Sequence, residues 1–84
     1  VKLWVSIGRD AGLRPGDLMG AIVNEAGIAA GDVGMIDIAP RFSLVEVPEG
    51  SADDVIAALS NTRLKGERPS VRRDREGGEG GGSF

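Results

Sequence analysis

The order in which two hydrophobic periodicities alternate constrains this chain more than any other feature of its sequence. Apolar side chains recur at every second position in short, strand-like segments and at helical spacing in longer ones. The strand-like segments are residues 3–7, 35–38, 42–47 and 68–73, and the helix-like segments are residues 15–26 and a stretch that begins at Ser51. A chain of 84 residues buries too little surface for two domains, so all six segments must share one core.

Local signals at the helix ends support this order. Pro15 can occupy the first position of a helix, where its missing N–H costs nothing, and Gly27 is placed to end the same helix. Ser51 stands three residues before Asp54, which predicts a capping-box variant at the start of the second helix.

The order strand-helix-strand-strand-helix-strand predicts an α+β fold, the βαββαβ ferredoxin-like sandwich. In this fold a four-stranded antiparallel sheet carries two helices on one face, and the other face is open to solvent. Residues 1–73 form the predicted domain. Residues 74–84 (DREGGEGGGSF) have almost nothing to bury, and they predict a Gly-rich flexible tail.

The open face of the predicted sheet receives most of the aromatic side chains. The first and third strands are central in this topology, and alternation turns Lys2 and Trp4 outward from the first and Phe42 and Leu44 outward from the third. Two of the three aromatic residues of the chain then lie beside cationic groups. Flat rings and cations are what unpaired bases and phosphates require. The alternative is that either ring folds under a loop or the tail.

The net charge of −3 conceals a basic C-terminal segment. Residues 1–62 carry four basic and nine acidic groups, whereas residues 63–76 carry six basic and three acidic groups. Such asymmetry favours contact with a polyanion, although a solvated charged strand is the other interpretation. The predicted phosphate contacts are Lys2, Arg41, Lys65, Arg68, Arg72, Arg73 and Arg75.

The composition excludes most catalytic chemistry. The chain has no Cys and no His, which removes thiolate and imidazole metal sites and the Ser-His-Asp and Cys-His catalytic groups. The glycines at 8 and 12 lie in a turn, but the Gly-Lys-Ser/Thr ending of a nucleotide loop is missing. We therefore expect no enzyme activity, no metal and no cofactor in this segment.

The hydropathy of the sequence and its first residues indicate the cellular compartment of the protein. No apolar run approaches the length of a membrane span, and no signal-peptide pattern is present. We expect a cytoplasmic protein without membrane contact. Because the chain starts with Val1, we also expect it to be part of a longer polypeptide.

Two segments resemble the RNA-recognition motif. Residues 3–8 (LWVSIG) are similar to its first-strand motif, with Trp4 at the aromatic position, and residues 40–47 (PRFSLVEV) are similar to its third-strand motif, with Phe42 at the first stacking position. Leu44 and Val47 replace aromatic residues of that motif, and its leading basic-Gly pair is absent, so the chain resembles a divergent member.

A second resemblance covers about residues 1–73. The stretches IGRDAGLRPGDLMGAIVNEAGI, IDIAPRFSLVEVP and NTRLKGERPSVRRD are similar to the DbpA-type RNA-binding domain of bacterial DEAD-box RNA helicases. This resemblance implies a parent chain that is an ATP-dependent RNA helicase. It also implies that the partner is structured RNA, which in that family is ribosomal RNA, and that the protein has a role in ribosome biogenesis. The excess of Arg over Lys, 8 to 2, suits a family member from a thermophile.

The sequence thus predicts a non-catalytic RNA-binding module that tethers a helicase to structured RNA. Trp4 and Phe42 would stack bases with support from Leu44, while the basic residues neutralise phosphates. The rival hypothesis is a protein-interaction or dimerisation module that pairs through the same open face.

Overall fold

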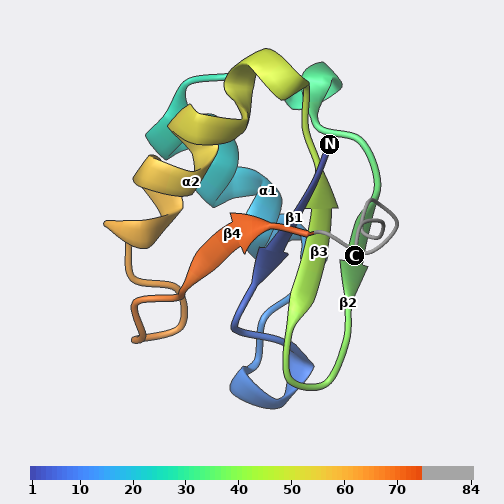
Figure 1. The fold of residues 1–84 in the computed structure, drawn as a ribbon. Coiled ribbons are helices and arrows are strands. Elements are labelled where there is room, and N and C mark those ends of the chain that lie inside the picture. The colour runs from blue at the N-terminus through green and yellow to red at the C-terminus, as the bar shows by residue number, and fades with distance from the viewer. Residues whose placement is uncertain (75–84) are drawn as a thin grey trace, which may run out of the picture.

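The computed structural model describes residues 1–74 and confirms the predicted order of elements (Figure 1). Four strands form one antiparallel sheet, and two helices pack on one of its faces. The elements are β1 (Lys2–Val5), α1 (Pro15–Ala21), β2 (Ile36–Ile38), β3 (Ser43–Glu46), α2 (Ala52–Ser60) and β4 (Val71–Arg73). The fold is therefore the predicted ferredoxin-like α+β sandwich, with strands that are shorter than the sequence pattern suggested.

The strand order β2-β3-β1-β4 puts β1 and β3 in the centre of the sheet. Trp4 of β1 is opposite Leu44 of β3 on one side and Arg72 of β4 on the other. On the far side of β3, Leu44 is opposite Asp37 of β2. Because directly opposed residues point to the same face, these four side chains form a row across the open face.

The core lies between the sheet and the helices. Leu3, Val5 and Val45 of the central strands are fully buried, as the period-two pattern predicts. From the helical layer, Leu18 and Leu59 are also fully buried. The centre of the sheet is therefore largely apolar on the helical side, where Ser43 is a buried polar residue, and the aromatic residues lie on the other side.

The first helix is longer than α1 alone. The chain continues from α1 into a wider π-type turn over Ile22–Ala26, and Gly27 ends it with φ +75°. This is the left-handed conformation that glycine adopts without penalty. It confirms the prediction that Gly27 ends the first helix. Ile22 in the π-type turn is fully buried, so the widened turn still packs against the core.

The capping box predicted for the second helix is wrong. A short 3-10 turn, Glu49–Ser51, runs directly into α2, so the backbone of Ser51 is already helical. Its side chain makes no capping hydrogen bond. A serine caps a helix from an extended backbone conformation, and the preceding turn removes that conformation.

A tight turn and an edge strand complete the sheet. Leu64 and Glu67 exchange two backbone hydrogen bonds of 2.7 and 2.9 Å. Lys65 and Gly66 between them both have positive φ, as the tightest hairpin turns require. The chain therefore reverses direction in a hairpin-like turn around Gly66. Within residues 1–74, no helix is long and apolar enough to cross a membrane.

Candidate nucleic-acid interface

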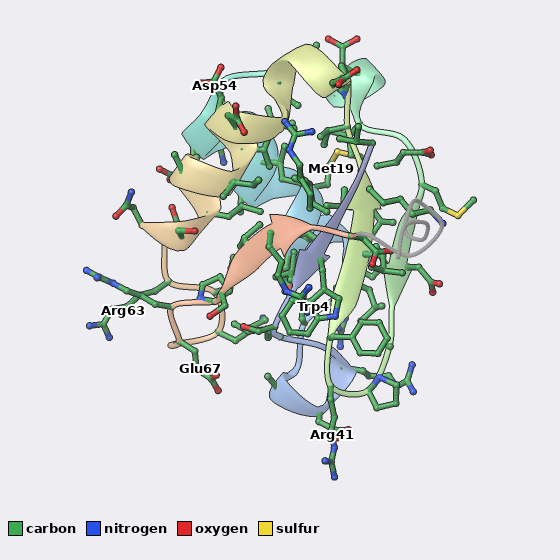
Figure 2. The ribbon with its side chains drawn as sticks, in the orientation of Figure 1. Trp4, Met19, Arg41, Asp54, Arg63 and Glu67 are labelled. Atoms are coloured by element: carbon green, nitrogen blue, oxygen red, sulfur yellow. The ribbon has the colours of Figure 1, made fainter. Side chains whose placement is uncertain are left out.

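Two aromatic rings lie together on the open face of the sheet. The ring centroids of Trp4 and Phe42 are 6.2 Å apart, and the ring planes differ by 18°. Figure 2 shows Trp4 over the strands, on the side away from α1 and α2. Both rings are half-buried, so neither is folded under a loop of the described chain. The predicted aromatic pair is present, and we call Trp4, Phe42 and the adjoining Arg72 the platform.

Arg72 contacts the platform from the edge strand. The central guanidinium carbon of Arg72 lies 4.4 Å from the centroid of the Trp4 ring, which is a cation–π contact. The sequence predicted a phosphate contact for Arg72, and in this structure its guanidinium group lies over the indole ring. Bases stack on guanidinium planes as well as on aromatic rings, so this arrangement extends the stacking surface.

A network of backbone hydrogen bonds fixes the loop that carries Phe42. Arg9 and Asp10 donate their backbone N–H groups to the carbonyls of Ala39 and Pro40, each at 2.8 Å. A Cβ at Gly8 would collide with backbone atoms of Ala39 and Phe42, so only glycine allows this close approach. The turn at Gly8, which the sequence discounted as a nucleotide loop, positions one of the two rings.

The remaining residues predicted on the open face are in place. Leu44 is half-buried between Trp4 and β2, and Lys2 is exposed opposite Glu46. Arg41 is exposed at the end of the loop before Phe42, where Figure 2 shows it extending beyond the end of the sheet. Lys2 and Arg41 therefore lie at opposite ends of the platform.

Two of the predicted phosphate contacts lie elsewhere, in ion pairs on the helical side. The Lys65 ammonium is 3.2 Å from a carboxylate oxygen of Asp17 in α1. The hydrogen bond from Lys65, and then the one from the backbone N–H of Arg14, lower the pKa of Asp17 below its ordinary value. Arg73 lies 3.3 Å from Asp53 of α2. These cations are held by acids of the helical layer and do not adjoin the platform.

Arg68 and Arg75 complete the set of predicted residues. Arg68 is exposed and precedes the edge strand β4. Arg75 lies outside the described residues, as does the predicted tail of residues 74–84 except for Asp74. In the described part of the chain, no three or more metal-ligating side chains come together.

A hollow that was not predicted from the sequence lies beside the platform. It is open to solvent, and its lining includes Lys2, Met35, Asp37, Leu44 and Glu46. The alternation of residues 35–38 carried part of the signal, because it turns Met35 and Asp37 to the open face together, but it does not show the register change beside Glu46. The side chain of Met35 is 65% exposed, an unusual position for a large apolar group.

Comparison with protein families gives one match over almost the whole described chain. The family model described as the DbpA RNA binding domain matches residues 2–73. The platform, the hollow and all described basic residues fall within that match.

Individual relatives agree with this match. This chain is 40% identical to the ATP-dependent RNA helicase DeaD of Mycobacterium tuberculosis over 62 residues. The match covers 74% of this chain and 11% of that helicase. Over 73 residues, 87% of this chain, it is 32% identical to the ATP-dependent RNA helicase DbpA of Bacillus subtilis, of which the match covers 15%. The chain thus corresponds to a small part of the length of these helicases.

A solved structure has the same fold. It is described as giving structural insights into cis element recognition of non-polyadenylated RNAs by the Nab3-RRM. The structural match covers 87% of this chain and 92% of the chain in that solved structure, with a TM-score of 0.71 and 16% sequence identity.

Proposed function

This chain belongs to the DbpA RNA-binding domain family, and from that premise we propose that its open sheet face binds unpaired RNA. The observation that carries the proposal is the platform, in which two aromatic rings and a guanidinium adjoin one another on an uncovered sheet. Stacking of a base on such a surface contributes about 1–3 kcal/mol and tolerates any base, because every base has a π-face.

The cations around the platform are arranged for a backbone that crosses the sheet. Lys2 and Arg41 are exposed at its two ends, and neither makes an ion pair within residues 1–74. Arg72 lies between them on the neighbouring strand. A strand of RNA that stacks on Trp4 and Phe42 would bring phosphates within reach of all three cations.

We further propose that the domain acts within a longer helicase chain. Its relatives named above are ATP-dependent RNA helicases, and the match corresponds to a small part of each. The domain contributes RNA binding and no catalysis, and it tethers the ATP-driven core to structured RNA, with ribosomal RNA as the substrate. Unpaired nucleotides of a hairpin loop are the part of such an RNA that the platform can stack.

The test uses the single tryptophan of the chain, which lies in the platform. Titration with an unpaired RNA octamer of mixed sequence is expected to quench Trp4 fluorescence. Phe42→Leu keeps an apolar side chain but removes the flat ring, and it is expected to weaken binding about 5- to 150-fold, the loss of one stacked base. Met19→Leu is the matched control, because Met19 is half-buried against the core in the helical layer.

Two results would contradict the proposal. One is a wild-type chain that does not bind the octamer. The other is a Phe42→Leu variant that binds as tightly as the Met19→Leu control while circular dichroism reports a folded domain in both.

A further inference from the structure

The hollow beside the platform differs from it in chemistry. Its lining combines apolar groups, Met35 and Leu44, with the carboxylates of Asp37 and Glu46 and one cation, Lys2. The platform itself carries only aromatic and cationic groups. One open face therefore has a region suited to stacking and phosphates, and beside it a region that repels phosphate.

An irregularity at the start of β2 builds this hollow. The backbone carbonyl of Glu46 accepts a hydrogen bond from the N–H of Gly34 at 2.7 Å, and the backbone N–H of Glu46 donates to the carbonyl of Met35 at 2.9 Å. Two residues, Gly34 and Met35, therefore lie opposite the single residue Glu46. This is the pattern of a β-bulge, which redirects side chains at sheet edges. A Cβ at Gly34 would lie 3.1 Å from Cβ and 3.2 Å from Oε1 of Glu46, so the absent side chain leaves room for the carboxylate.

The carboxylates of Asp37 and Glu46 have no side-chain partners within residues 1–74. Among residues 1–74, neither Asp37 nor Glu46 accepts a side-chain hydrogen bond or forms an ion pair. Ionised carboxylates only accept hydrogen bonds, so a ligand that fills the hollow must present N–H or O–H donors and an apolar surface.

The hollow and the platform are joined by Leu44. Leu44 is opposite Trp4 on one side and opposite Asp37 on the other, so Asp37 is two strands, roughly 10 Å, from the platform. One unpaired RNA strand can therefore place a base on the platform and its neighbour in the hollow.

We propose that the hollow is a base-selecting subsite, in which Asp37 and Glu46 accept hydrogen bonds from the exocyclic amino group of an unpaired base. The inference rests on the proposed function, because it needs RNA on the sheet face. An amino group is a donor that a carboxylate recognises, as in the pairing of Asp or Glu with cytosine N4. Uracil presents carbonyl oxygens on both sides of its single N–H, and these oxygens face the carboxylates with like partial charge. The subsite therefore selects amino-bearing bases over uracil.

The test compares two RNA octamers with equal phosphate charge, rC8 and rU8. The wild-type chain is expected to bind rC8 at least about fivefold more tightly than rU8, the lower limit for one good base contact. In the double variant Asp37→Asn, Glu46→Gln the side-chain amides can donate to uracil O4, and the preference is expected to fall below about twofold. The matched control, Glu25→Gln with Asp54→Asn, makes the same charge change at exposed positions of the helical layer and should keep the preference.

A second variant perturbs the hollow without changing charge. Gly34→Ala places a methyl group against the Glu46 side chain and is expected to reduce the preference for rC8 at least about twofold, with binding of rU8 unchanged.

Each contrary outcome has a distinct meaning. Equal binding of rC8 and rU8 that still depends on Phe42 would overturn the subsite and leave the proposed function standing, whereas no binding of either RNA would overturn the proposed function. Equal changes in the double variant and its control would assign the effect to net charge and overturn the subsite. Sedimentation could also show that the chain self-associates. If the double variant alters that self-association and its control does not, the occupant of the hollow is a second copy of the chain, and the base-selecting subsite is overturned.

Discussion

The salt dependence of RNA binding follows from the placement of the cations. Among residues 1–74, Lys2, Arg41 and Arg72 lie on or at the ends of the open face, whereas Lys65 and Arg73 are held in ion pairs by acids of the helical layer. Each phosphate neutralised on a single strand contributes about −0.7 to the slope of log K against log salt concentration. Three cations therefore predict a slope of about −2, or a loss of roughly 20-fold in affinity between about 50 and 200 mM salt.

The contrast with the six predicted phosphate contacts that lie within residues 1–74 is large. If Lys65, Arg68 and Arg73 also bound phosphates, six contacts would give a slope of about −4 and a loss of roughly 300-fold over the same range. The assay is titration of Trp4 fluorescence with an unpaired octamer at several concentrations of potassium chloride.

A single neutral substitution sharpens this prediction. Arg41→Gln removes one contact at the end of the platform and is expected to make the slope shallower by about 0.7. Arg63→Gln is the control, because Arg63 is exposed and extends away from the sheet (Figure 2). A slope near −4 that Arg41→Gln leaves unchanged would refute the assignment of binding to the open face.

Three further predictions concern the scaffold. Ser43→Ala should lower the free energy of unfolding in urea by about 1–3 kcal/mol, because the fully buried hydroxyl of Ser43 donates to a backbone carbonyl at 2.7 Å; an unchanged midpoint would contradict this. Gly8→Ala should destabilise the fold by more than about 1 kcal/mol, because the new Cβ would meet backbone atoms. Gly16→Ala should stabilise the fold by about 0.5–1 kcal/mol, because Gly16 lies in α1 with open space around it. Equal effects of the two substitutions would refute the close approach at Gly8. Lys65→Met should raise the pKa of Asp17 towards its ordinary value in a carbon-13 NMR titration, and a pKa that stays low would show that the ion pair is not its main cause.

The sign of the Asp17 effect sets its pH range. Because the pKa of Asp17 is lowered in the folded state, the stabilisation from its ion pair is present above the ordinary carboxyl pKa and is lost as the pH falls through the lowered value. Asp17 is exposed enough for solvent to screen this pair, so the NMR titration, and not a stability curve, is the suitable measurement.

The sheet was predictable because strand alternation is local. A shift of one residue would turn every side chain of a strand to the other face, so the apolar side chains of Leu3 and Val5 already determine that Trp4 points outward. The platform follows from the same rule once β1 and β3 are placed side by side. The sequence pattern therefore contained the topology, the core and the two rings.

The errors arose where one element meets another. The 3-10 turn before α2 depends on how the chain leaves β3, and no signal at Ser51 itself predicts it. Alternation places Arg73 on the same side of the sheet as the inward Val71. Its ion pair with Asp53, however, depends on where α2 packs against the edge of the sheet. The hollow depends on two residues opposing Glu46, a register change that periodicity alone does not determine.

The most direct test of the central claim is an NMR titration of the chain with a ribosomal RNA hairpin that has an unpaired loop. If the open face binds RNA, the indole N–H of Trp4 and the amides of β1 and β3 are expected to shift first, while the amides of α2 on the opposite face stay in place. Shifts confined to the helical layer or to residues 63–68, with the indole of Trp4 unchanged, would contradict it.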